Sequence, residues 1–489
     1  MLRFDNSYAR LPERFYTPQQ PTAVSAPRLV RLNALLADEL GLDPEALGSP
    51  QGVQLLAGNT IAASSEPIAM AYAGHQFGNF VPQLGDGRAI LLGEVIGRDG
   101  NRRDIQLKGA GRTRYSRSGD GRLALGPALR EYLISEAFAA LGIATTRSLA
   151  VVTTGDMVFR ETLLPSAVLA RVAASHIRVG TFQFFAARSD PEGVMTLADY
   201  VIERHYRKAA EAPDKYRALL DTVIQRQADL IARWQLVGFI HGVMNTDNMA
   251  ISGETIDYGP CAFMDSYDPA QVYSYIDQAG RYSYGNQPYI AQWNLARFAE
   301  TLVPLLAENK EAGLRHAQEA IDGFTNDFET AYTAGIRRKL GLNREMNGDR
   351  ALGQELLECM AQEKADFTSA FRLLCEIATD TSDESVFRRL FTNPAAINGW
   401  LQKWRQRLAE DGGDGAGRRL AMRSVNPAYI PRNHRIEEAL NSAVSDGDFA
   451  PFETLLTVLS QPFEYQPDYQ GYAEPPRPEQ VVQNTFCGT

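Results

Sequence analysis

The stretch 241–259 constrains this chain more than any other part of the sequence. A long amphipathic run precedes it, which predicts a helix that ends shortly before the stretch. A polar loop then places Asp247 and Asn248 next to each other, and a turn at residues 252–255, flanked by two short apolar segments, leads to Asp257. We therefore expect a helix, a loop that presents an aspartate and an asparagine, and a hairpin that ends at a second aspartate.

This order of elements is the one in which protein kinases present the asparagine and aspartate that hold magnesium. Asn248 follows His241 by seven residues, as in the kinase pattern H-R-D-x-x-x-x-N, but Val243 stands where a kinase has its catalytic base. The stretch therefore predicts a metal and nucleotide site without the usual base for phosphoryl transfer. For His241 we favour a buried histidine that braces the loop over a direct role in catalysis.

Composition and charge exclude several classes of protein. The 489 residues have room for roughly two to four domains, and 44% hydrophobic with 22% charged residues is typical of a globular protein. A net charge of −10 without a basic run argues against nucleic acid as a partner. No apolar stretch is long enough to span a membrane and no signal peptide is evident, so we expect a cytoplasmic protein.

A glycine-rich turn and a strand lie in the first third of the chain. Gly85 and Gly87 come just before the apolar run 89–94, where backbone N–H groups without a Cβ can approach a phosphate closely. Taken alone, such a Gly-x-Gly is more often a plain tight turn. The run 104–108 then alternates as a strand does and ends in Lys108.

The helix predicted at residues 126–141 carries Glu131 and Glu136. A strand lysine followed by a helix glutamate is the arrangement by which kinases fix the lysine against nucleotide phosphates. Both faces of this helix carry apolar residues, so periodicity leaves open which glutamate pairs with Lys108. In isolation, a surface lysine and a solvated glutamate are the alternative.

Elsewhere the elements are less specific. Arg171 and Arg178 can clamp phosphate oxygens, with exposed surface arginines as the alternative. We expect helices in the N-terminal extension and through most of the chain after residue 289, and an extended tail after residue 461. The predicted helices are 27–42, 197–206, 215–239, 293–306, 314–340, 355–379, 384–391, 395–408 and 435–444. The predicted short strands are 148–152, 157–161 and 167–173.

Taken together, these elements predict an α+β protein with a bilobal kinase-like fold, an N-terminal extension and a large helical C-terminal extension. The approximate parts are residues 1–165 for the extension and N-lobe, 166–300 for the C-lobe core, and 301–489 for the helical extension and tail. A triphosphate carries dense negative charge, which lysine, arginine and backbone donors neutralise while Asn and Asp oxygens hold magnesium.

The chain resembles the selenoprotein O family, also called YdiU, over nearly its whole length. The resemblance lies in the segments 71–88, 107–117, 241–248, 255–265, 280–287 with 293–295, and 426–433. It implies a pseudokinase fold that binds ATP in reversed orientation and transfers AMP, rather than phosphate, to hydroxyl side chains of proteins.

The resemblance also implies roles for individual residues. Lys108 would hold phosphates with Glu131 as its ion-pair partner, and Asp247 would be the base that replaces the aspartate missing at Val243. The other implied site residues are Gly85, Gly87, Arg88, Asp120 and Gly121 along the nucleotide, Arg171 and Arg178 on the terminal phosphates, and Asn248 with Asp257 on Mg²⁺ or Mn²⁺, Asp257 also contacting the nucleotide.

The cysteines add one hypothesis. The four are too few and too scattered for a disulfide framework or a zinc site. Cys487 occupies the place of the selenocysteine described near the C-terminus of many eukaryotic family members, and Cys261 follows Asp257 closely. We hypothesise a disulfide between Cys261 and Cys487 that controls the active-site loop, with an inert tail thiol as the alternative.

Two other functions stay open from the sequence. One is ordinary phosphoryl transfer, which the valine at position 243 disfavours. The other is a non-catalytic ATP-binding scaffold, which the presence of both Asn248 and Asp257 disfavours.

Overall fold

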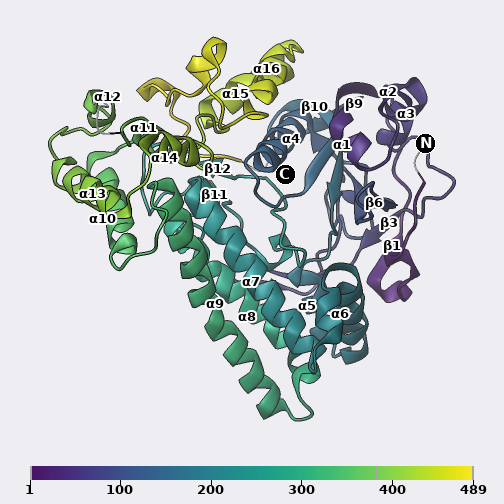
Figure 1. Cartoon of the computed structure of the whole chain (residues 1–489). Helices are drawn as coiled ribbons and strands as arrows, with labels where there is room; N and C mark the ends of the chain where they lie inside the picture. Colours follow the sequence, from purple (N-terminus) through teal and green to yellow (C-terminus); the bar gives the residue numbers. More distant parts are fainter. Residues whose placement is uncertain (1–2, 380–382, 487–489) are drawn as a thin grey trace.

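An antiparallel sheet of eight strands forms one side of the molecule in the computed structural model, which describes residues 3–379 and 383–486 (Figure 1). The strand order is β1-β3-β6-β7-β10-β9-β2, with β8 paired to β10. The strands are β1 Tyr16–Pro18, β2 Arg28–Leu32, β3 Ile68–Met70, β6 Ala89–Ile96, β7 Arg102–Lys108, β8 Leu123–Ala124, β9 Arg147–Phe159 and β10 Leu163–Ala173. Two small ribbons pair β4 Gly74–Gln76 with β5 Asn79–Val81, and β11 Phe239–Ile240 with β12 Ala262–Phe263.

Helices cover both faces of the sheet. The apolar side chains of α1 Ala34–Glu39, α2 Pro44–Gly48 and α3 Pro50–Leu56 pack on one face, together with Ile90 and Ile105 of the sheet. On the other face lies α4 Leu125–Ala140, whose Leu129 and Leu133 are fully buried. Since both faces are covered, β6 is almost continuously apolar and its first seven residues are buried.

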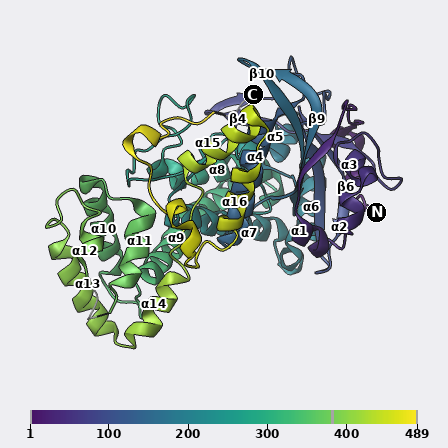
Figure 2. The same cartoon turned by 90° about the horizontal axis from the view of Figure 1, so that it is seen from above.

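The remaining helices form three groups, which Figures 1 and 2 separate. Below the sheet in Figure 1 lie α5 Val179–Ala186, α6 Pro191–His205, α7 Lys215–Leu236, α8 Gln287–Leu306 and α9 Lys310–Lys339. At the left lie α10 Asp349–Glu363, α11 Phe367–Glu376, α12 Ser385–Arg388, α13 Asn398–Asp411 and α14 Gly415–Arg423, and at the top α15 Asn433–Asn441 and α16 Ala450–Leu459.

This mixed α and β structure confirms the expected class at that level. The helices predicted at 126–141, 215–239 and 314–340 are present with ends that differ by a few residues. Among the described residues, no helix is long and apolar enough to cross a bilayer.

Four local predictions were wrong. Residues 27–42 form strand β2 and helix α1, because the backbone of β2 pairs with β9 and Asn33 caps α1 by accepting a hydrogen bond from the Leu36 N–H. The helix predicted at 355–379 is broken by Lys364 at φ 54°, after which Asp366 caps α11. The runs 148–152 and 157–161 were expected as two separate strands, but β9 continues without a break from Arg147 to Phe159 and ends before residue 160.

The fourth error concerns the hairpin expected around residues 252–255. The turn itself exists, with Gly253 N–H bonded to the Ala250 carbonyl. Its flanks pair elsewhere: Ala250 bridges to Arg178 and Thr255 to Thr145. The backbone around Asp257 is therefore tied to segments distant in sequence, which local turn chemistry does not reveal.

Lys339, at the end of α9, gives a prediction for stability. It is buried, its ammonium lies 4.2 Å from the centre of the Phe371 ring, and burial lowers its pKa from 10.5 to about 7. The unfolded chain therefore binds more protons than the folded chain between these two pH values, so the free energy of unfolding should rise with pH across that window.

Lys339→Met is expected to raise the free energy of unfolding by about 2 kcal/mol at pH 7, because the variant no longer loses ammonium hydration on folding. The gain should shrink as the pH approaches 10, where the unfolded lysine also loses its charge. Denaturant titrations at pH 7 and 10 measure both values. Lys403→Met, at a lysine whose side chain is 62% exposed, is the matched control and should change little; a gain at pH 10 equal to that at pH 7 would contradict the prediction.

Candidate functional site

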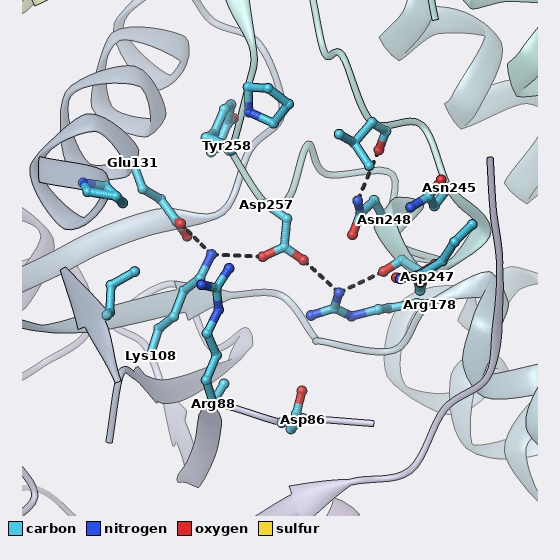
Figure 3. Close-up of a pocket in the computed structure, with 18 of the residues that line it drawn as sticks. Asp86, Arg88, Lys108, Glu131, Arg178, Asn245, Asp247, Asn248, Asp257 and Tyr258 are labelled. Carbon is cyan, nitrogen blue, oxygen red and sulfur yellow. Dashed lines mark hydrogen bonds and ion pairs between the residues drawn. The ribbon is translucent and has the colours of Figure 1, made fainter. Parts of the chain in front are cut away.

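A cavity of about 340 Å³ opens between the sheet and the loop that follows β11 (Figure 3). The sheet contributes Lys108 from the end of β7 and Arg171 from β10, which lie on adjacent strands. Helix α4 contributes Glu131, and the loop contributes Asp247, Asn248 and Asp257. Lys108 and Asp257 are about 150 positions apart in the sequence. They line one cavity because of the register of the sheet and because the bridges Arg178–Ala250 and Thr145–Thr255 fix the loop beside it.

The structure pairs Lys108 with Glu131. The lysine Nζ lies 2.5 Å from Glu131 Oε2 and 3.0 Å from Asp257 Oδ1. Glu136 faces away from the cavity and binds Arg147 at 2.7 Å. The ambiguity between the two glutamates is thereby resolved, and the alternative of a surface lysine is wrong, since Lys108 is only 5% exposed.

The carboxylate of Asp257 accepts hydrogen bonds from three cations. Besides Lys108, Arg171 Nη1 lies 2.6 Å from Oδ1 and Arg178 Nη1 lies 2.6 Å from Oδ2. Burial acts to raise the pKa of Asp257, but the positive charges of Lys108, Arg171 and Arg178 outweigh it and hold the pKa well below its usual range. The carboxylate is therefore ionised at any physiological pH.

Both arginines are buried, which rules out the alternative of exposed surface residues. Arg171 also contacts Glu131 at 3.2 Å and Gln106 at 2.6 Å, and Arg178 lies 4.8 Å from the Tyr72 ring centre. The Nε atoms of both arginines are buried without a hydrogen-bond partner among the described residues. Three cations thus share two carboxylates at the closed side of the cavity, an arrangement that favours an incoming anion.

Asp247 lies next to Arg178, in the single 3₁₀ turn Thr246–Asn248. Arg178 Nη1 donates to the Asp247 carbonyl at 2.6 Å, and Gln76 Nε2 donates to the carboxylate at 3.4 Å. The other carboxylate oxygen, Oδ1, is buried without a hydrogen-bond partner in the described structure. Burial raises the pKa of Asp247 to about 6.

The oxygen atoms near Asp247 bear on the expected metal. In Figure 3 the side chains of Asn248 and Asp257 face the same space as Asp247, and Asn248 Nδ2 donates to the Val243 carbonyl at 2.9 Å. The described residues include no group of three or more His, Cys, Asp or Glu side chains suited to a metal. Mg²⁺ needs only one or two protein oxygens when substrate phosphates complete its shell, so Asn248 and Asp257 fit that ion.

Gly85, Asp120 and Gly121 line a neighbouring groove of about 600 Å³ rather than the cavity itself. This groove holds Gly85, Asp120 and Gly121 and shares Gly87, Arg88 and Asp247 with the cavity. A Cβ on Gly85, at φ +75°, would meet the Tyr115 ring at 2.3 Å. The packing of Tyr115 therefore requires a glycine at position 85. The sequence had instead suggested that this glycine lets a phosphate approach the backbone.

Sequence reasoning missed several residues of the site. Asp86 is buried in the cavity wall, where its Oδ2 accepts from Met70 N–H and Gln106 Nε2, and burial raises its pKa to about 6. A Cβ on Gly74 would lie 2.4 Å from Asp247 Oδ1. Gly74 and Gln76 belong to the segment 71–78, which resembles the selenoprotein O family. The residues of this segment do not by themselves indicate that it contacts Asp247.

His241 has the contacts of a loop brace. It is buried, its Nε2 lies 2.9 Å from the Ile256 carbonyl, and its ring stacks on Trp234. Burial lowers its pKa, so the ring is neutral at physiological pH. These contacts join the end of α7 to the segment that carries Asp257.

The C-terminal segment reaches the same region. Thr485 Oγ1 donates to the Pro260 carbonyl at 2.5 Å, and Phe486 lines the cavity. Cys261 is buried next to these contacts. Cys487 lies outside the described residues, so the hypothesis of a disulfide between the two cysteines stays a prediction.

Buried cations beside acidic and amide oxygens in one cavity are suited to bind a polyphosphate. The chain matches the family model "Protein adenylyltransferase SelO" over residues 1–460. It is 61% identical over 486 residues to the protein nucleotidyltransferase YdiU of Rhodopseudomonas palustris strain BisB18, and 61% identical over 492 residues to that of Methylorubrum extorquens strain PA1; 99% of each chain is covered in both comparisons. The chain belongs to the SelO family.

Proposed function

We propose that this protein is an ATP-dependent adenylyltransferase that transfers AMP to Ser, Thr or Tyr hydroxyls of proteins and releases pyrophosphate. The observation that carries this function is a cation cluster, Lys108, Arg171 and Arg178, that lines the same cavity as Asp247, with Arg178 Nη1 donating to the Asp247 carbonyl. Val243 occupies the position of a kinase base, while Asp247 has a buried carboxylate oxygen without a hydrogen-bond partner among the described residues.

The proposal extends to the fold. We describe it as a bilobal, kinase-like pseudokinase in which the sheet and α4 form the N-lobe and helices α5–α8 the C-lobe core. The cavity between them, lined by Lys108 on one side and Asn248 on the other, supports this description. The parts stay at residues 1–165, 166–300 and 301–489, although strand β10 continues through the first boundary.

Within this function the terminal phosphates of ATP lie against the cations. Lys108, Arg171 and Arg178 neutralise their charge, and Glu131 keeps Lys108 in place. Asn248 and Asp257 would hold Mg²⁺ or Mn²⁺, and the ion would neutralise phosphate charge when bound. Gly85, Gly87, Arg88, Asp120 and Gly121 line the groove where the rest of the nucleotide fits.

The chemical step then follows from the reversed orientation. The acceptor hydroxyl attacks the α-phosphorus, the bond from that phosphorus to the bridging oxygen breaks, and pyrophosphate leaves with the bonding electrons. Asp247 takes the proton of the hydroxyl, since its carboxylate is ionised at neutral pH. The cation cluster stabilises the charge that develops on the leaving pyrophosphate.

Incubation with ATP labelled on either the α- or the γ-phosphate tests the function. We expect label from the α-phosphate on the protein acceptor and none from the γ-phosphate, because only AMP is transferred. Label from the γ-phosphate alone would establish phosphoryl transfer instead. The absence of both labels, with ATP binding intact, would establish a binding scaffold.

A further inference from the structure

The hairpin formed by β9 and β10 ends in an exposed apolar surface. Met157, Phe159 and Leu163 are 56%, 70% and 65% exposed. Phe159 pairs directly with Leu163 across the hairpin, and Met157 lies two residues before Phe159 on the same strand. Since side chains alternate along a strand, all three point to the same face, while Val158 between them is buried on the other. We call these three residues the hairpin tip.

The hairpin tip is continuous with the groove that contains Asp247. Phe159 and Arg160 line this groove together with Gly87 and Asp247. Arg160 holds the tip against the 111–122 loop, donating to the Asp120 carboxylate at 2.8 Å and to the Arg122 carbonyl at 2.9 Å. An acceptor that approaches Asp247 over a nucleotide in this groove therefore meets the hairpin tip at the groove's edge.

The 111–122 loop, which Arg160 contacts, is basic. Arg112, Arg114 and Arg117 of the 111–122 loop are exposed, and Arg117 lines the groove. The carboxylate of this loop, Asp120, is already bound by Arg160. In a chain with a net charge of −10, this local concentration of arginine favours acidic side chains on whatever binds here.

We propose that the hairpin tip and the arginines of the 111–122 loop dock the acceptor protein through an acidic segment that carries an apolar side chain close to the modified hydroxyl. This inference rests on the proposed function, which requires a protein hydroxyl to reach Asp247 at the groove. The apolar side chain packs on Met157, Phe159 and Leu163, and its acidic neighbours face Arg114 and Arg117. Loss of water from about three large apolar side chains supplies affinity, and the charges supply selection.

Three fluorescent peptides with one serine each test the docking surface. The first has glutamates and a phenylalanine near the serine, the second has lysines in place of the glutamates, and the third lacks the phenylalanine. Anisotropy measures their binding to the full chain in the presence of a nonhydrolysable ATP analogue. We expect the first peptide to bind at least tenfold more tightly than the other two.

Variants then locate the binding. The triple variant Met157→Ser, Phe159→Ser and Leu163→Ser should weaken binding of the first peptide at least tenfold, and Arg114→Glu with Arg117→Glu should do the same. Ile96→Ser with Leu420→Ser, at positions 47% and 65% exposed outside the groove, is the matched control and should bind as the natural chain does. Melting temperatures, expected to be unchanged, show that the variants are folded. Because Phe159 and Arg117 line the proposed nucleotide groove, peptide binding is compared at a concentration of the ATP analogue that saturates each variant.

The outcomes separate the two proposals. Equal binding of the three peptides, no binding of any, or unchanged binding by the triple variant would overturn the docking surface. A second copy of the chain as occupant would appear as a change of mass in sedimentation between the natural chain and the triple variant, and would equally overturn it. Absence of α-label transfer by the natural chain contradicts the adenylyltransferase instead, because peptide binding does not depend on chemistry.

Discussion

Asp257→Asn is expected to reduce transfer of the α-label by about 10³-fold or more. The substitution keeps the shape of the side chain but removes the negative charge that Lys108, Arg171 and Arg178 share. It also removes an oxygen charge from the proposed magnesium site, so both metal binding and the orientation of the phosphates should fail together.

The same change should destabilise the free protein. Lys108 and Arg171 then keep Glu131 as a close carboxylate, whereas Arg178 loses the carboxylate that it binds in the described structure, and unpaired buried charge costs about 3 kcal/mol. Added ATP, which brings its own negative charge, should recover part of the melting temperature. Radiolabel transfer and thermal denaturation with and without ATP measure the two effects.

Glu136→Gln is the matched control for this experiment. It removes a carboxylate from the same helix as Glu131, but one that binds Arg147 outside the cavity. It should lower stability without loss of transfer. Transfer retained by Asp257→Asn, or lost equally in Glu136→Gln, would contradict the role assigned to Asp257.

Asp247→Asn is expected to reduce transfer by about 10²- to 10⁴-fold, the usual contribution of a positioned general base. The amide keeps the size of the side chain and cannot accept the hydroxyl proton. Affinity for ATP should change little, because the substitution keeps the Asp247 backbone carbonyl that Arg178 contacts and leaves the contacts of Lys108 and Arg171 intact. Label transfer under saturating ATP, together with calorimetric ATP binding, separates the two properties.

A second carboxylate in the cavity, that of Asp86, provides a comparison for this prediction. Asp86 is also buried there with its pKa raised to about 6, but one of its oxygens is bonded to Met70 N–H and Gln106 Nε2. Asp86→Asn is therefore the comparison variant. A large loss in Asp86→Asn with none in Asp247→Asn would assign the base to Asp86 and remove Asp247 from the mechanism.

Local sequence patterns predicted the helix α7 and the strand residues 104–108 and 167–173, but they missed strand β2 and the break in the helix predicted at 355–379. Helix α7 is amphipathic over its 22 residues, because a single face of it packs against the core. Residues 27–42 have leucines at helical spacing as well, yet part of the segment is strand β2 because β9 offers its backbone a partner. Short segments follow the hydrogen bonds available to them, and those bonds come from distant parts of the chain.

The sequence by itself determined the order of the chemical groups: the lysine at the end of a strand, a glutamate on the next helix, and Asn248 and Asp257 in a loop that lacks a base at Val243. Only the tertiary structure decided that Glu131 faces Lys108, that Arg171 and Arg178 are buried against Asp257, and that the hairpin tip borders the groove of Asp247. Periodicity reports which side of an element is apolar. The partner of each charged group depends instead on sheet register and on how α4 is turned over the sheet, which long-range packing fixes.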